Sequence, residues 1–248
     1  MKVLHIVRTF GHVNQPYTKK LFRELKRLGN HNHFMSSEFR RKIYKNEIID
    51  ISTKLLNDLF KSNYFFVLSV LLFNKDFLFA TKNLSYKKKI HFILKWEDLI
   101  RHKYDLIHLH HIQVFDITIL KFLKKKKTPI VVSFRGSDII IGSMNKLKRE
   151  EIIEKLKYIN HIHVISNYLK EVSKKADIDL PISVVYRGQI NSNINETIAR
   201  LKKERIKIIC VGRLAWEKGQ VYLLDSIFRL KEKGYNIQLD IYGEGNFR

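Results

Sequence analysis

The sequence predicts an α/β fold built on a parallel β-sheet, and three observations lead to that prediction. Short apolar runs of strand length alternate with longer segments that have the apolar spacing of amphipathic helices. Strands separated by helices of this length imply parallel pairing through right-handed crossovers. The chain has 248 residues, 45% of them hydrophobic, which is enough to bury a substantial core. Because such a sheet binds ligands at the carboxyl ends of its strands, functional residues are expected there.

The first hundred residues begin with a clear strand and helix and then become irregular. Residues 3–7 form an apolar run that predicts a buried strand. Residues 18–28 predict an amphipathic helix that ends at Gly29, and residues 33–36 predict a weak second strand. From residue 44 to residue 102 the pattern is irregular but helical, and it contains the aromatic stretch FKSNYFFVLSVLLFNKDFLF.

The regular alternation resumes after this region and completes a first domain. Strands are predicted at residues 105–111, 128–134, 161–166 and 181–186, and helices at residues 115–127, 146–158 and 167–175. Together with the first strands they predict a parallel-sheet domain over residues 1–190.

A polar, asparagine-rich stretch, GQINSNINETIARLKKE, follows this domain and supplies a linker at residues 191–204. The alternation then restarts, with strands predicted at residues 205–212 and 236–243 and a helix between them at residues 220–234. Two strands and one helix cannot cover both faces of a parallel sheet. Residues 205–248 are therefore expected to be the first β-α-β part of an incomplete second domain.

The charge balance is the most unusual feature of the composition. The chain carries 47 Lys and Arg residues against 24 Asp and Glu residues, a formal net charge of +23. This excess predicts an anionic partner, and the candidates are nucleic acid, anionic lipid headgroups and phosphorylated substrates. The alternative is a compositional bias toward lysine, asparagine and isoleucine.

The sequence points to a reducing, cytoplasmic compartment. Cys210 is the single cysteine and lies in an apolar run, where we expect a small buried side chain rather than a disulfide or a zinc ligand. The N-terminus enters a strand directly, without the pattern of a signal peptide. The longest apolar run, residues 64–73, is half the length of a membrane span.

The stretch VGRLAWEKGQ, residues 211–220, combines the features of an anion site. A loop from the carboxyl end of a strand to a helix N-terminus exposes unpaired N–H groups and the positive end of the helix dipole. Arg213 and Lys218 add two cations, while Gly212 and Gly219 let the backbone approach a ligand closely. No carboxylate cluster nearby would hold a metal, so these cations could neutralise a diphosphate leaving group without Mg²⁺. The alternative is a solvated Arg and Lys beside an ordinary turn.

Residues 206–248 resemble the opening of the donor domain in family-4 retaining glycosyltransferases. They carry the Gly-Arg-Leu, the following Lys-Gly, a Leu-Leu helix and the Gly-x-Gly after the next strand. Earlier segments resemble the same family more loosely: YDLIHLHH, PIVVSFRGSDI, HVISNYLKEV and VVYRGQI. The resemblance covers the chain except residues 50–95. It implies a GT-B fold, in which two Rossmann-like domains face across a cleft, with the acceptor on the first and the sugar nucleotide on the second.

The resemblance also implies the roles of the donor-side residues. Arg213 and Lys218 would be catalytic, since they would hold the diphosphate of the nucleotide sugar and stabilise its departure. The other donor-binding residues would be Gly212, Gly243, Glu244 and Gly245. The nucleotide sugar would be a substrate, and neither a cofactor nor a metal is implied.

The sequence departs from the family pattern in two places. The family's pair of glutamates, which binds the donor sugar and ribose, would lie beyond Arg248, so we expect these residues alone not to turn over substrate. Many relatives have a Gly-Gly pair after the first strand, where RTFGHVNQPYTKKLF has only Gly11, followed by Gln15 and Tyr17. Loops of this kind occur in the branch that builds capsular and cell-surface polysaccharides, and Gly11 and Gln15 are candidates for the acceptor side.

Four further residues are candidates for the cleft, because each lies at the end of a predicted strand or just after it. His110 and His111 belong to a His-x-His-His cluster that begins at His108, and a metal site is the alternative function for this cluster. No third ligand type accompanies the cluster and the family needs no metal, so we predict none. Arg135 and Asp138 follow the next strand, where many relatives carry a His in place of Arg135. An arginine there cannot act as a base but can bind an anionic group of donor or acceptor, with Asp138 orienting it. A salt-bridged turn is the alternative.

Basic runs near the aromatic stretch predict a contact with anionic membrane. These are Lys87–Lys89 and Lys124–Lys127, next to the aromatics of residues 64–79. A solvated helix end beside a core helix is the alternative. The expected location is therefore the cytoplasm, with peripheral binding at the inner face of the plasma membrane.

These observations favour a glycosyltransferase that moves a hexose from a nucleotide sugar to a glycan or lipid-linked acceptor, with retention of configuration. The alternative is a basic nucleic-acid-binding α/β protein without enzymatic activity. Against it, the positive charge is spread over many segments, no binding motif is recognised, and the aromatics lie in apolar runs. We therefore expect no nucleic-acid partner.

Overall fold

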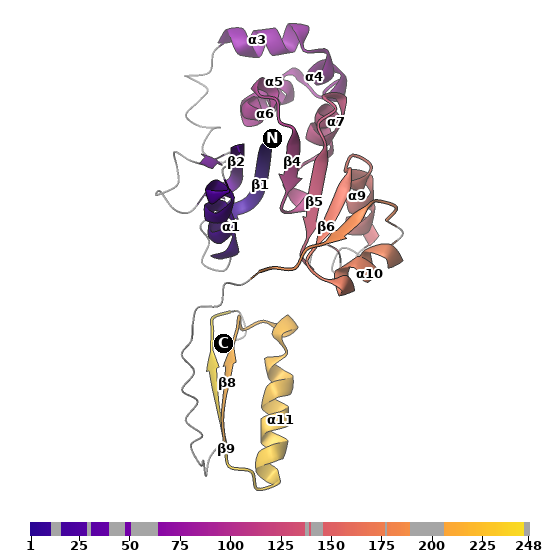
Figure 1. Ribbon diagram of the computed structural model, residues 1–248. Coiled ribbons are helices and arrows are strands. Elements are labelled where there is room, and N and C mark those ends of the chain that lie inside the picture. Colours follow the sequence, from indigo (N-terminus) through magenta and orange to yellow (C-terminus); the bar gives the residue numbers. More distant parts are fainter. Residues whose placement is uncertain are drawn as a thin grey trace. The chain divides into compact units, whose positions relative to one another are not determined.

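The computed structural model describes residues 1–10, 16–28, 31–39, 48–50, 64–136, 139, 146–176, 178–188 and 206–245 (Figure 1). The chain divides into two compact units, Met1–Gln189 and Ile190–Arg248, and each is described by itself. The predicted linker, residues 191–204, lies outside the described residues.

The first unit is built on a seven-stranded sheet with the order β3-β2-β1-β4-β5-β6-β7, and all of its pairings are parallel. Its strands are β1 (Lys2–Phe10), β2 (His31–Phe39), β3 (Ile48–Asp50), β4 (Leu106–Leu109), β5 (Ile130–Phe134), β6 (His161–Val164) and β7 (Ile182–Val184). The strand order reverses at β1, which pairs with β2 on one side and with β4 on the other. Such a reversal is where an open parallel sheet forms a crevice for ligands.

The helices of this unit are α1 (Pro16–Arg27), α3 (Tyr64–Phe73), α4 (Lys75–Ala80), α5 (Tyr86–Lys95), α6 (Glu97–Arg101), α7 (Ile117–Lys125), α9 (Lys146–Leu156) and α10 (Asn167–Lys175). Short polar side chains cap three of them, because the oxygens of Asn74, Asp116 and Ser166 accept from backbone N–H groups in the first turn. The predicted α/β fold is confirmed, with each expected strand and helix of the regular region present.

The prediction for residues 44–102 was wrong in one respect, because the sheet continues there into β3. This strand has only three residues, and so short a run leaves no alternation that could be recognised in the sequence. The strand predicted at residues 33–36 is also longer than expected and spans nine residues.

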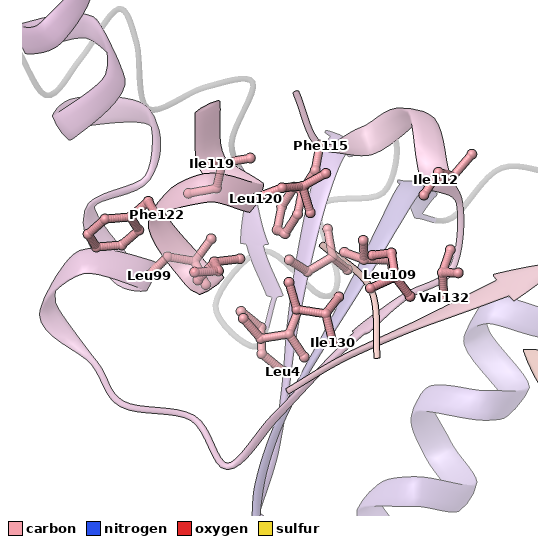
Figure 2. Packing of buried hydrophobic residues seen from close by; sticks show 14 of the residues in the cluster. Leu4, Leu99, Leu109, Ile112, Phe115, Ile119, Leu120, Phe122, Ile130 and Val132 are labelled. Atoms are coloured by element: carbon pink, nitrogen blue, oxygen red, sulfur yellow. The ribbon is translucent and has the colours of Figure 1, made fainter. Parts of the chain in front are cut away.

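One face of the sheet carries the main hydrophobic core. The alternate residues of four strands that point to this face are fully or almost fully buried: Leu4, Ile6, Ile107, Leu109, Ile130, Val132, Phe134, Ile162 and Val164. In Figure 2, Ile119, Leu120 and Phe122 of α7 lie over Leu109, Ile130 and Val132. The amphipathic α1 instead packs Phe22 against Val7 and Phe34, in a smaller cluster of its own.

The second unit contains β8 (Ile206–Val211), a 3₁₀ turn η3 (Trp216–Lys218), α11 (Gln220–Glu232) and β9 (Ile237–Tyr242), with β8 and β9 parallel. Among its described residues, only Ile227 and Ile237 are buried hydrophobics, while Val221, Leu224 and Phe228 are exposed. Cys210, expected to be buried, is only half-buried, because its sheet has two strands.

The main core should respond strongly to truncation of a central strand residue. Ile107 is fully buried in the central strand β4, and Ile107→Ala should lower the free energy of unfolding by about 2–5 kcal/mol, because it leaves a cavity. Leu147→Ala on the exposed side of α9 should change it by less than about 0.5 kcal/mol. Urea denaturation of both variants measures this, and equal effects would contradict the described core.

Candidate functional site

The second face of the sheet is polar where the first is apolar. Along β4 and β6 buried apolar residues alternate with partly exposed residues, and three of the latter are His108, His161 and His163. Registered residues of parallel strands point to the same face. His5 is registered with His108, and Ser133 with His163, so these four polar side chains share one face of the sheet.

A continuous hydrogen-bond chain leads from this face to Arg135. Asn32 donates from Nδ2 to the Leu25 carbonyl at 3.1 Å, which fixes the orientation of its amide. Its Oδ1 accepts from His5 Nε2 at 3.1 Å, and His5 Nδ1 lies 3.2 Å from His110 Nε2. The guanidinium of Arg135 donates to His110 Nδ1 and to the Tyr17 hydroxyl. These hydrogen bonds therefore place the ring proton on Nε2 in both His5 and His110.

A second chain runs parallel to the first. His108 Nε2 lies 2.7 Å from Ser133 Oγ, which lies 2.8 Å from His163 Nδ1. His163 Nε2 donates to the Val185 carbonyl at 3.1 Å. When His163 is neutral, this bond leaves its Nδ1 as the acceptor for Ser133 and makes His108 the donor to the serine. The two chains together satisfy a row of polar groups that a sheet face would otherwise bury unpaired.

His5, His108 and His110 are held in the neutral form. Burial lowers the pKa of His5 from 6.5 and lowers the pKa of His110 well below that value. Burial, with smaller contributions from His5, His163 and Arg135, lowers the pKa of His108 to about 3. A neutral His110 is what the guanidinium of Arg135 requires, since an imidazolium has no lone pair to accept its hydrogen bond.

His5 of β1, which was not among the predicted residues, joins His108 and His110 of the His-x-His-His cluster. The ring nitrogens of His5, His108 and His110 lie within 4.8 Å of one another, which raises the question of a metal. Both nitrogens of His5 and of His110 are already hydrogen-bonded, and the cation Arg135 touches His110. A metal ligand needs a lone pair directed at the ion, and an adjacent guanidinium repels it. The arrangement favours a hydrogen-bonded cluster, and a metal-free site stays a prediction.

Both chains end at a cavity of about 330 Å³ beyond the carboxyl ends of the strands. Arg135 follows β5 and Arg187 follows β7, and both guanidiniums stack on Tyr17 of α1, with Cζ at 4.3 Å and 4.5 Å from the ring centroid. The remaining lining residues are Lys20, Leu21, Glu24, His108, His110, Ser133, His163, Ile165, Val185, Tyr186 and Gly188. The cavity can accept a small polar ligand, and its charged side chains are mostly cationic.

The second unit holds the donor-side candidates in the loop between β8 and α11. Arg213 forms an ion pair with Glu217, and its carbonyl accepts from Gln220 Nε2 at 2.8 Å. Lys218 ends η3 as an exposed side chain, and Gly219 follows in the left-handed conformation, with φ 67°. The loop thus presents Arg213 and Lys218 at the N-terminal end of α11, where an anion is favoured.

The Gly-x-Gly after β9 meets this loop directly. A Cβ on Gly243 would lie 1.8 Å from the Gly212 carbonyl oxygen, and one on Gly245 would lie 2.0 Å from that of Leu214. The Leu214 N–H donates to the Glu244 carbonyl at 3.0 Å, so the backbone pairing of β8 and β9 continues past the strand ends. Glycine is required at both positions because the two backbone segments approach each other closely. This holds whether or not the two residues also line a nucleotide site.

The structure brings some predicted residues together and leaves others apart. His110 and Arg135 meet in the cavity. His111 does not line it but accepts from Gln113 N at 3.3 Å, capping the 3₁₀ turn η2 (Ile112–Val114). Three further candidates lie outside the described residues, namely Gly11, Gln15 and Asp138.

Four residues of the two candidate sites were not predicted as site residues: His5, Tyr17, Arg187 and Glu217. His5 and Tyr17 come from elements far in sequence from the histidine cluster, and no local pattern marks them. Arg187 lies in the quoted VVYRGQI, but only its stacking on Tyr17 places it in the cavity. Glu217 stands four residues after Arg213, a spacing that could have suggested the ion pair.

The fold is that of a GT-B glycosyltransferase, and the chain belongs to glycosyltransferase family 4. The model of Glycosyltransferase Family 4 matches residues 15–189, and the model of Glycosyl transferases group 1 matches residues 192–248. The boundary between the two matches falls near the boundary between the two compact units.

A curated relative and two solved structures resemble the chain. The capsular polysaccharide biosynthesis glycosyltransferase CapH of Staphylococcus aureus is 27% identical over 169 residues, which are 65% of this chain and 46% of CapH. The apo form of the lipopolysaccharide outer core galactosyltransferase WaaB has a TM-score of 0.58 at 17% identity. Anabaena Alr3699/HepE in complex with UDP and glucose has a TM-score of 0.58 at 12% identity. Both structures match 100% of this chain, which spans 62% of each of them and about half of CapH.

Acid should destabilise the first unit through its buried histidines. Because the folded-state pKa values of His5, His108 and His110 lie below 6.5, the unfolded chain takes up these protons first as the pH falls. Their contribution to stability is complete above pH 6.5 and falls below it, by up to about 1.4 kcal/mol per pH unit for each histidine. For His108 the decline ends near pH 3.

Urea denaturation between about pH 7.5 and pH 5 measures this slope. His108→Gln should make it shallower, while His91→Gln, on the exposed side of α5, should leave it unchanged. Equal slopes for the wild type and both variants would show that the buried histidines do not control acid stability.

Proposed function

We propose that this chain is part of an enzyme that transfers a hexose from a nucleotide sugar to a glycan or lipid-linked acceptor in cell-surface polysaccharide biosynthesis. Membership of glycosyltransferase family 4 supports the reaction type, and the similarity to CapH supports the capsular process. The family membership also favours this function over nucleic-acid binding. Retention of configuration, independence of metal, and the absence of a cofactor are parts of the proposal.

The donor side of the proposal rests on one observation: the loop before α11 presents Arg213 and Lys218 at the N-terminal end of the helix. The diphosphate of a nucleotide sugar carries its negative charge where these two cations lie, and more charge develops when the sugar leaves. Preorganised cations stabilise that charge in the transition state, and no proton transfer is needed.

Binding of the diphosphate exchanges one anion for another at Arg213. The guanidinium pairs through Nη2 with Glu217 Oε1, and a phosphate carries more charge and can accept from two of the guanidinium nitrogens. Arg213 is thereby kept in an oriented rotamer before the donor arrives, which lowers the entropy lost on binding.

On the acceptor side, the first unit supplies the cavity beside Arg135 and His110. Burial keeps the pKa of His110 low, so its ring is neutral and serves to orient Arg135. Arg135 remains charged at all working pH values and cannot take a proton from an acceptor hydroxyl. Its role is to bind and orient an acceptor or donor group.

A second surface supports peripheral contact with anionic membrane. Helix α3 is apolar apart from Ser69, yet several of its side chains face solvent, with Phe65 84% and Phe73 77% exposed. Beside it lies an open depression lined by Phe66, Val70, Phe73, Ile100, Arg101 and His102, among others. No helix among the described residues has the length and apolarity to cross a bilayer. An exposed apolar helix with basic neighbours instead suits the headgroup region.

The lysines near this surface do not all serve it equally. Lys126 Nζ donates to the carbonyls of Leu99, Ile100 and His102, and Lys124 Nζ donates to the Lys157 carbonyl. These two side chains therefore stabilise the fold. Lys125 stacks on Phe79 at 4.1 Å and Lys127 is exposed, so this pair remains for anionic headgroups.

The donor-side proposal is tested by titrating the chain with UDP, the nucleotide bound in the HepE structure. Lys218→Ala should weaken binding by roughly 10- to 100-fold, because one charge-assisted hydrogen bond contributes about 1.5–3 kcal/mol. Lys231→Ala, a matched loss of charge at the other end of α11, should have no effect. Binding that survives Lys218→Ala at full affinity would mean that the diphosphate does not sit on this loop.

The membrane proposal is tested by sedimentation with vesicles. Binding should rise with the fraction of anionic lipid and fall as NaCl is raised from about 0.05 M to 0.5 M, because salt screens the lysines. Replacing Phe65 and Phe73 together by Ser should reduce binding, whereas Tyr168→Ser on α10 should not. Equal binding to neutral and anionic vesicles would exclude the electrostatic part.

A further inference from the structure

Arg135, Arg187 and Tyr17 form a stacked cluster in the cavity of the first unit. Both guanidiniums lie over the same tyrosine ring, and Arg135 also donates to the Tyr17 hydroxyl. Each arginine follows a different strand, β5 or β7, and the tyrosine lies at the start of α1. Three segments distant in sequence thus bring two cations to one ring.

The two arginines are held in different ways. Arg135 is fixed by the buried chain through His110, His5 and Asn32, so its position is set by the sheet. Arg187 is exposed, and within the described part of the chain its only polar or aromatic contact is the stacking on Tyr17. Stacking orients the plane of a guanidinium and leaves its edge N–H groups available to a ligand.

Most charged side chains that line the cavity are cationic. Among the lining residues that the structure describes, Lys20, Arg135 and Arg187 are positive and Glu24 is the one carboxylate. His108 and His110 stay neutral and do not offset this excess. An oxyanion that accepts from both guanidiniums would offset their positive charge.

We propose that this cavity binds an oxyanion of the acceptor, a phosphate or a carboxylate, through Arg135 and Arg187 held on Tyr17. The inference rests on the proposed function, because it names the chemical class of acceptor that the first unit takes. Two sources supply this chemistry, the diphosphate of a lipid-linked acceptor and the carboxylate of an acidic sugar. The shared element is a planar or tetrahedral oxyanion that accepts from two arginines.

The test titrates the chain with geranyl diphosphate, with glucuronate and with neutral glucose, and measures binding by calorimetry. All titrations use chains that also carry Lys218→Gln, so that the donor-side loop does not add a second diphosphate site. At least one charged probe should bind more tightly than glucose. Arg187→Gln should weaken that probe by at least about tenfold, as expected for loss of one charge-assisted pair. Arg135→Lys should also weaken it, because an ammonium cannot reproduce the bidentate fork.

The matched control is Lys174→Gln, which removes one positive charge from α10, outside the cavity lining. It should leave all affinities unchanged. Tighter binding of geranyl diphosphate would identify a lipid-linked acceptor, and tighter binding of glucuronate an acidic sugar. Equal affinities in Arg187→Gln and in the parent chain for both charged probes, or no binding of either, would overturn the inference. When the UDP titration at Lys218 is run in chains that also carry Arg187→Gln, it reports on the donor side alone, so the two proposals fail independently.

Discussion

The hydrogen-bond chain from Asn32 through His5 and His110 to Arg135 is the interaction on which the cavity of the first unit depends. It crosses the point where the strand order of the sheet reverses, between β1 and β4. These hydrogen bonds can form because burial keeps the imidazoles neutral. The His5 ring is stacked on Phe34, with the ring centroids 4.9 Å apart. Protonation of His110 would remove the lone pair that holds Arg135, so the apolar packing around the histidines also sets the position of the guanidinium.

The sheet therefore separates two tasks between its faces. One face is apolar, buries its aliphatic residues under α7 and supplies the stability of the unit (Figure 2). The other face places satisfied polar groups where ligands reach the carboxyl ends of the strands. The donor-side loop of the second unit uses a different device, because Arg213 and Lys218 are surface residues. There the ion pair with Glu217 orients the arginine, and two glycines let the strand ends meet.

Much of the fold could be predicted from the sequence, because apolar strand runs and amphipathic helices are local patterns. The helix at Asn167–Lys175 was predicted to the residue. Short β3 was missed, since three residues give no period. Less of the site could be predicted from the sequence. Arg135 and His110 follow strands and were expected in the cleft. His5 and Tyr17 reach the site only through the pairing of strands and the packing of α1, which no local pattern indicates. Lysines 124 and 126 were assigned to a membrane surface, although they bind backbone carbonyls.

Long-range ¹H–¹⁵N spectra of the histidine side chains test the hydrogen bond that orients Arg135, because they report which ring nitrogen carries the proton. We expect His5 and His110 to be neutral and protonated on Nε2 at about pH 7.5, and His110 to remain so when the pH is lowered to about 5.5. Assignment by His5→Gln and His110→Gln identifies the signals. An imidazolium signal from His110 in this range, or a proton on its Nδ1, would contradict the hydrogen bond that orients Arg135.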